Sequence, residues 1–152
     1  GDDSQPDITR AGVAVIGLGR DGAPSTVTSR FPATALGRAP QFAIAFATDS
    51  SLLVPTFGAD AAEGVEPHGD ELVRLDLETG GSEILLTSAK AFDFGEVRCA
   101  APCGACFLAD AGAVGVHRFT FDAGSDSAVF TEAALVQIDD GIGLPPRFLG
   151  AL

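Results

Sequence analysis

The chain has 152 residues, a net charge of −12 and a hydrophobic content of 46%, which together indicate a folded domain with a substantial core. The negative charge disfavours nucleic acid and anionic membrane surfaces as partners, because their phosphates repel an acidic surface. Trp and Tyr are absent, so any aromatic binding surface has to be built from the 11 Phe residues. No apolar run is long enough to span a bilayer, and no transmembrane segment is predicted.

Residues 1–10 are predicted to form a flexible N-terminal tether, because small and polar residues dominate the first seven positions. Such a segment is typical of a chain that has lost a signal peptide, or of a bacterial lipoprotein whose lipid-bearing Cys precedes it. This interpretation predicts an extracellular, periplasmic or cell-surface-attached protein with a lipid anchor at the removed N-terminus. The alternative is that the segment only marks a boundary of the chain.

Short strands separated by turns are expected along the rest of the chain, since no window combines helical periodicity with suitable caps. Polar or glycine-rich turns are expected at 48–51 and 79–81. Strands of this length and spacing predict an all-β domain, namely a sandwich, a barrel or a propeller. The candidate strands are 13–22, the neighbourhood of Val27, 42–46, 52–54, 72–77 and 84–86.

An internal repeat favours one of these architectures. Residues 36–46 recur at 142–152, 106 positions later, with Gly, Pro, Phe and Ala in register. Two units of 53 residues predict a further copy at 89–99, which is present in a degenerate form without the Pro. Further along, 52–58 matches 106–112 and 73–78 matches 117–122, and the shorter offset of the second match places an extra loop at about 59–70.

Each unit therefore holds four short strands in about 40–55 residues, which is the period of a propeller blade. The run from Leu52 to Gly58, followed by Val73 to Gly80, resembles the surface-layer and YncE-like (YVTN or NHL-type) β-propeller repeats. The turn at 101–104 departs from the Pro-Asp-Gly that is usual in that family, because Cys103 stands where Asp is common. The resemblance implies structural repeats that carry no catalytic residues.

The predicted fold is all-β, with β-propeller-type repeats of four short antiparallel strands forming an incomplete propeller over 11–152. A ring needs about four blades to close, and an open stack leaves strand edges exposed. Three interpretations therefore stay open: the chain is a piece of a longer polypeptide, it completes a ring with copies of itself, or the fold is a β-sandwich. The blade parts are expected at about 11–30, 36–88, 89–135 and 136–152.

The three cysteines are the most specific chemical feature of the sequence. If residues 101–104 form a type I turn, the hairpin places Cys99 opposite Cys106 at a separation that suits a disulfide. This bridge implies an oxidising compartment and leaves Cys103 as a candidate free thiol. A bridge between Cys99 and Cys103, and reduced or otherwise paired thiols, are the alternatives.

No metal and no cofactor is predicted. The spacing of the three cysteines matches a radical iron–sulfur motif, but the β/α alternation that accompanies such motifs is absent. Cys103 and Cys106 have the spacing of a zinc or copper ligand pair, with His117 as a third ligand, but a second Cys pair is absent. The acidic loop at 60–70 and the residues at 139–141 lack the spacing of a calcium loop, which favours solvated loops. His68 is expected at the surface of that loop and His117 on the polar face of its strand.

These observations predict a non-catalytic extracytoplasmic binding or scaffold module that recognises a protein partner or associates with itself. No catalytic residue is predicted, because the sequence holds no G-x-S-x-G, HExxH or P-loop motif. The resemblance implies that partners use the top face or the central channel, with the insertion at 59–70 projecting from one rim. Two alternatives are a structural protomer that assembles into a ring or filament, and a part of a propeller enzyme whose active site lies mostly outside this chain.

Overall fold

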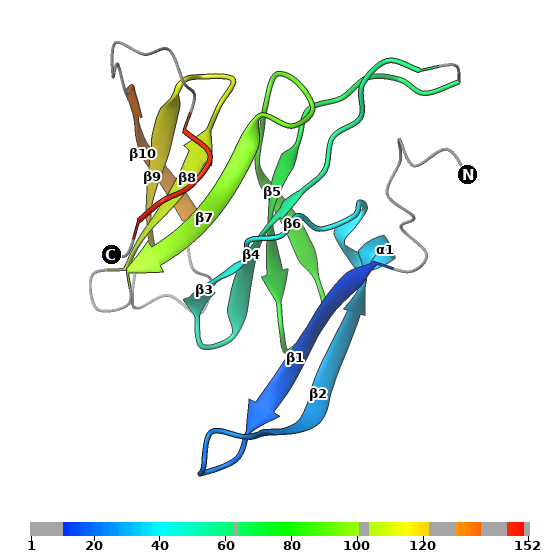
Figure 1. Cartoon of the computed structure of the whole chain (residues 1–152), viewed down its shortest axis with the longest axis vertical. Helices are drawn as coiled ribbons and strands as arrows, with labels where there is room; N and C mark the ends of the chain where they lie inside the picture. The colour runs from blue at the N-terminus through cyan, green and yellow to red at the C-terminus, as the bar shows by residue number, and fades with distance from the viewer. Residues whose placement is uncertain (1–10, 63, 101–103, 122–129, 138–145, 151–152) are drawn as a thin grey trace.

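The computed structural model contains three antiparallel β-sheets and one helical turn, so the expectation of an all-β chain is confirmed (Figure 1). It describes residues 11–62, 64–100, 104–121, 130–137 and 146–150, and the predicted tether at 1–10 lies outside them. Within the described residues, no helix has the length and apolar character that crossing a bilayer requires.

The first sheet is a hairpin of β1 (Gly12–Leu18) and β2 (Pro24–Pro32), which extends away from the rest of the chain (Figure 1). It leads into α1 (Ala33–Leu36), which ends at Gly37 in the left-handed conformation with φ 77°. A single turn of four residues is too short to show a helical period, which explains why the sequence did not predict it. Ala33 and Leu36 are buried, so packing rather than propensity stabilises this turn.

The other two sheets have the same up-and-down topology, with strands that are neighbours in sequence pairing side by side. Each is a four-stranded antiparallel meander. The middle sheet consists of β3 (Ala45–Thr48), β4 (Ser51–Thr56), β5 (Glu71–Asp76) and β6 (Ser82–Thr87). The third sheet consists of β7 (Phe94–Ala100), β8 (Ala105–Asp110), β9 (Gly115–Phe121) and β10 (Phe130–Gln137).

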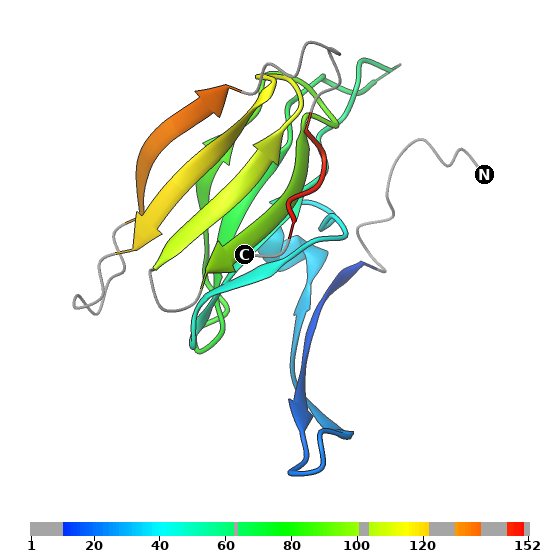
Figure 2. The ribbon, with the colours of Figure 1, turned by 60° about the vertical axis from the view of Figure 1, so that its left-hand side comes forward.

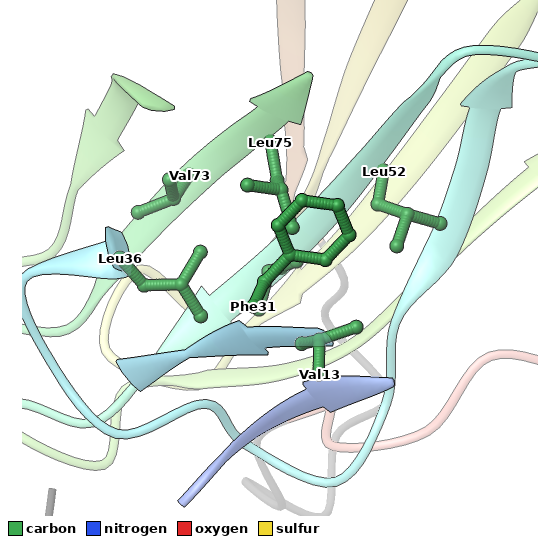
Figure 3. Close-up of a cluster of buried hydrophobic side chains, with 7 residues drawn as sticks. Val13, Phe31, Leu36, Leu52, Val73 and Leu75 are labelled. Atoms are coloured by element: carbon green, nitrogen blue, oxygen red, sulfur yellow. The ribbon is translucent and has the colours of Figure 1, made fainter. Parts of the chain in front are cut away.

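The two central strands of the middle sheet, β4 and β5, are covered on both faces, whereas the outer strands β3 and β6 are partly exposed. One face packs against the β1–β2 hairpin and α1, where Phe31 and Leu36 meet Leu52 and Leu75 (Figure 3). The opposite face packs against β7, β8 and β9 through a second apolar cluster that includes Leu53 and Leu72. All six residues of β4 are consequently buried, which accounts for its continuous apolar run in place of an alternating one.

The three sheets are therefore layered in chain order, and β3 and β7 lie beside each other at one edge of the stack (Figure 2). The segment 146–150 follows β7 on its other side, where the Glu96 N–H donates to the Arg147 carbonyl oxygen at 2.9 Å. Three chain segments that begin successive repeat units thus run next to one another. The pockets described below lie along these segments.

Candidate functional site

An apolar pocket lies where the chain enters β3 and β7, and residues 147–148 close its side. Its volume is about 430 Å³, which is within the range of small-ligand and side-chain pockets. We call it the aromatic pocket, because half of its lining is Phe. The lining consists of Gln41, Phe42, Ala43, Phe57, Phe92, Phe94, Gly95, Glu96, Arg147 and Phe148.

Aromatic contacts organise the wall of this pocket, although its rim is open to solvent. The Phe42 ring meets Phe57 edge-on at a centroid distance of 5.8 Å, and Phe57 meets Phe92 at 5.9 Å. Phe42 is nevertheless 98% exposed and Phe148 is 85% exposed. Large apolar side chains held in fixed contacts but left in water are typical of interaction sites.

The backbone around Phe92 is strained. Phe92 has a φ of 63°, a left-handed conformation that bulky residues rarely adopt. Its N–H donates to the Asp70 carboxylate at 3.0 Å, and its carbonyl oxygen accepts a hydrogen bond from the Arg147 guanidinium. The backbone of Phe92 is therefore held on both sides of its Cα atom, and its aromatic ring is held in the pocket lining.

One carboxylate and two guanidinium groups lie at the edge of the pocket, and they are not equivalent. The Glu96 carboxylate binds Arg98 at 2.6 Å and accepts the Leu149 N–H at 2.7 Å. The hydrogen bonds from Arg98 and from the Leu149 backbone lower the pKa of Glu96, so this carboxylate is ionised. Its negative charge is balanced by the Arg98 guanidinium. Among the described residues, Arg147 forms no ion pair with a carboxylate.

Close packing fixes the position of Arg147. A Cβ atom at Gly95 would collide with the Arg147 carbonyl oxygen, so only glycine at this position permits 146–150 to lie against β7. Glu96 binds the main chain of Arg147, and Phe92 binds its side chain. Arg147 therefore places a positive charge at the pocket, although the chain as a whole is strongly acidic.

A second hollow of about 600 Å³ adjoins the aromatic pocket and runs along β3 and β7. The two hollows share Phe42, Ala43 and Glu96 in their linings. Exposed Phe42, Ile44 and Phe46 form a ridge along one wall, and the far wall carries Arg98. We call this hollow the β3–β7 trough.

The cysteine pair predicted from the sequence is present in the structure. Cys99 and Cys106 form a disulfide between directly opposed residues of β7 and β8, with Cα atoms 4.0 Å apart. The adjoining pair of Ala100 with Ala105 shows that the register is the expected one. Such bridges are typical of oxidising compartments. Cys103, the candidate free thiol, lies outside the described residues.

The expectation of a solvated acidic loop at 60–70 is wrong for its last member. Asp70 is 0% exposed, and its carboxylate accepts backbone hydrogen bonds from Gly58 at 2.6 Å, Phe92 at 3.0 Å and Phe94 at 2.9 Å. It therefore joins the middle sheet to the start of β7. Asp60 and Glu66 are exposed, as a solvated loop requires, and Glu63 and the residues at 139–141 lie outside the described residues.

The expectation that His117 lies on a polar face is also wrong. His117 is buried in β9, where its ring stacks on Phe119 and its Nε2 atom lies 2.8 Å from the Asp110 carboxylate. Burial alone would raise the pKa of Asp110, but the hydrogen bonds from His117 and from the backbone N–H of Ala113 outweigh it and leave that pKa below its usual value.

His68 lies partly buried rather than fully at the surface. Its Nδ1 atom is 2.6 Å from an Arg38 guanidinium nitrogen, and the same guanidinium binds Glu71 at 2.8 Å. This network holds the base of the 59–70 loop against the segment that precedes β3.

A small cavity of about 190 Å³ adjoins Asp110 and His117 and includes Ser88 in its lining. The Ser88 hydroxyl is already committed, because it accepts the Asp70 N–H at 2.8 Å and donates to the Lys90 carbonyl oxygen at 2.6 Å. The Ser88 hydroxyl therefore serves as a structural connection between two backbone segments rather than as a nucleophile activated by a base. Within the part of the chain that the structure describes, no three His, Cys, Asp or Glu side chains are grouped to hold a metal ion.

No protein-family model, no curated protein and no solved structure matches this chain. The functional assignment therefore depends on the geometry of the chain itself, and above all on the aromatic pocket.

Proposed function

We propose that this chain is part of a β-propeller of the YncE-like (YVTN or NHL) type and acts as a non-catalytic binding module outside the cytoplasm. Its binding site is the aromatic pocket at the start of β3 and β7. The partner is a protein segment, which reaches the pocket through the β3–β7 trough.

The layering of the sheets supports a propeller over a sandwich. In a two-sheet sandwich each sheet has one buried and one solvated face. Here the middle sheet packs on both faces, against the hairpin on one side and against β7, β8 and β9 on the other. Successive four-stranded meanders that pack face to face, with their first strands side by side, are the arrangement of neighbouring propeller blades.

The observation that carries the binding function is the exposure of Phe42 and Phe148 at the mouth of an apolar pocket. Leaving two aromatic rings in water forfeits the free energy of burying them, about 1.5–3 kcal/mol for each Phe. A partner that covers them recovers this free energy. The Cys99–Cys106 disulfide supports a location outside the cytoplasm.

The experiment is selection of a random peptide library against the immobilised full chain, in two formats: with free C-termini and with residues flanking both ends. We expect enrichment of peptides with large apolar residues, and loss of their binding to the Phe42→Ser variant. The matched control is Leu18→Ser, which removes another largely exposed apolar side chain, 70% exposed, from the distant hairpin. If neither format yields peptides that distinguish these two variants, the proposed function is wrong.

A structural protomer is a second candidate, and the ridge of Phe42, Ile44 and Phe46, which leads into the edge strand β3, favours it. Exposed apolar side chains beside an edge strand promote association between copies. Sedimentation velocity over a wide concentration range tests this candidate. Reversible assembly that Phe46→Ser abolishes and Leu18→Ser leaves intact would support it, whereas a monomer at every concentration would contradict it.

A further inference from the structure

We propose that the aromatic pocket and the β3–β7 trough bind the free C-terminus of an extended polypeptide whose last residue is large and apolar. The terminal side chain enters the pocket, the terminal carboxylate binds Arg147, and the preceding residues lie along the trough. This inference rests on the proposed binding function and specifies its partner.

Charge complementarity at the pocket favours a carboxylate ligand. Arg147 is exposed, and its only hydrogen bond from the guanidinium to a described residue goes to the Phe92 carbonyl oxygen. A guanidinium carries five N–H donors in a planar fork, which leaves donors to form a paired contact with a carboxylate. Glu96, the acidic residue in the same lining, is engaged by Arg98 and by the Leu149 N–H. The net local charge therefore favours an anionic group next to the Phe rings.

One small carboxylate would leave most of the site empty. The pocket of about 430 Å³ opens into the trough of about 600 Å³, and the trough continues along the strands. Apolar side chains line the trough on the β3 side, so its occupant contacts the ridge over several residues. A chain that extends away from the pocket fits this shape, whereas a compact ligand does not.

The spacing of the exposed side chains on the ridge favours an extended peptide as the occupant of the trough. Phe42, Ile44 and Phe46 are exposed, whereas the intervening residues are half-buried. Phe42 lies at a bend, and Ile44 and Phe46 follow it where the chain enters β3. Side chains two residues apart on extended backbone are separated by roughly 6.5–7 Å, so Ile44 and Phe46 have the spacing of alternate side chains in an extended peptide. A peptide lying parallel to the ridge therefore presents one apolar side chain to each step of it.

The carboxylate-binding group is fixed before any ligand binds. Phe92 is held at a φ of 63° by the Asp70 carboxylate, and its carbonyl oxygen holds the Arg147 side chain. Gly95 keeps the Arg147 backbone against β7. Less conformational entropy is lost on binding when the recognition group is positioned in advance.

The experiment uses the full chain and a peptide pool that ends in Phe or Leu after four random positions, prepared as the free acid and as the C-terminal amide. We expect the acid pool to bind wild-type protein roughly 10- to 100-fold more tightly than the amide pool, the range for a charge-assisted hydrogen-bonded pair. Arg147→Gln should bind both pools equally, at the affinity that wild-type protein has for the amide. Arg20→Gln, at the tip of the distant hairpin, should behave as wild type.

Equal affinity of the acid and amide pools for wild-type protein, or no binding of the acid pool, overturns this inference. If library peptides with flanked ends bind in a Phe42-dependent way while the acid pool has no advantage, the proposed binding function stands and only the carboxylate contact fails. If 3-phenylpropionate competes as tightly as the best acid peptide, the ligand is a small apolar carboxylate and the trough has no part in binding. Circular dichroism of Arg147→Gln shows whether the variant is folded.

Discussion

The two four-stranded sheets share one strand order, yet different side chains join their first two strands. In the third sheet, β7 and β8 are linked by the Cys99–Cys106 disulfide. At the corresponding cross-strand position of the middle sheet, β3 and β4 pair Phe46 with Leu52. One backbone topology thus accepts either a covalent bridge or an apolar contact at the same point. The repeat specifies the pairing of strands, and it leaves open the interaction that stabilises each pair.

The interiors of the two sheets differ in a similar way. The repeat matches Thr56 and Val73 of the middle sheet with Asp110 and His117 of the third sheet. The Thr56 hydroxyl donates to the Glu71 carbonyl oxygen at 3.2 Å, whereas the His117 Nε2 atom and the Asp110 carboxylate form a buried hydrogen bond at 2.8 Å. The middle sheet is covered on both faces and carries neutral residues at these positions. The third sheet should therefore respond to reduction and to pH at positions where the middle sheet does not.

The largest effect expected from any difference between the two four-stranded sheets, or from their junction, follows from removing the side chain that connects them. Asp70→Ala leaves the buried N–H groups of Gly58 and Phe94, and the partly buried N–H of Phe92, without their acceptor. We expect the free energy of unfolding to fall by about 4 kcal/mol, since each unsatisfied buried donor costs roughly 1–3 kcal/mol and water satisfies part of the loss. Urea denaturation measures the change.

Asp60→Ala in the same loop is the control for the Asp70 substitution. Its side chain is exposed, so the free energy of unfolding should change by less than about 0.5 kcal/mol. Equal effects of the two substitutions would show that the Asp70 carboxylate does not join the sheets.

Reduction of the disulfide ranks second. The bridge closes a short loop, with its cysteines seven positions apart in sequence. Chain-entropy arguments then give a loss of about 2.5 kcal/mol on reduction. The measurement compares urea midpoints with and without reductant in a Cys103→Ser background, which excludes exchange with the third thiol. A Cys99→Val/Cys106→Val variant, with an apolar pair as in the middle sheet, should be insensitive to reductant.

A smaller, pH-dependent effect is expected at Asp110. The pKa of its carboxyl lies below the usual value, so the ionised form is stabilised in the folded protein. This contribution to stability is present above the unfolded-state pKa of about 3.9 and is lost as the pH falls through the folded-state pKa. Asp110→Asn should cost about 1–2 kcal/mol at neutral pH, and the difference from wild type should shrink at strongly acidic pH. A difference that is the same at both pH values would contradict the role of the charge.

Local patterns were sufficient to predict much of this fold. Alternating and apolar runs located most of the strands, although β3 spans Ala45–Thr48 rather than the expected 42–46. The turn predicted at 101–104 implied the register that places Cys99 opposite Cys106, and this register is confirmed. The sequence could not predict the environment of Asp70, because its hydrogen-bond donors lie 12 to 24 residues away along the chain. The burial of His117 did have a sequence signal, because the repeat aligns His117 with Val73, which is buried.

The aromatic pocket was only partly foreseeable. The repeat matched Phe42 with Phe148 as members of equivalent segments. That these two residues gather around one hollow with Phe57 and Phe92 depends on how β3, β7 and residues 146–150 lie side by side. Such an arrangement of segments far apart in sequence has no local signature, and the binding hypothesis could be attached to particular residues only through the structure.

The smallest effect on stability is expected at the pocket mouth, and it separates binding from folding. The Phe42 side chain is 98% exposed, so Phe42→Ser should change the free energy of unfolding by less than about 0.5 kcal/mol. Phe31→Ser, which replaces a buried Phe between the hairpin and the middle sheet, should cost about 3–5 kcal/mol in the same urea titration. If Phe42→Ser destabilises the chain as strongly as Phe31→Ser does, this ring belongs to the core. A stable Phe42→Ser protein that no longer binds selected peptides assigns the ring to recognition, because the substitution then removes contacts that only a partner makes.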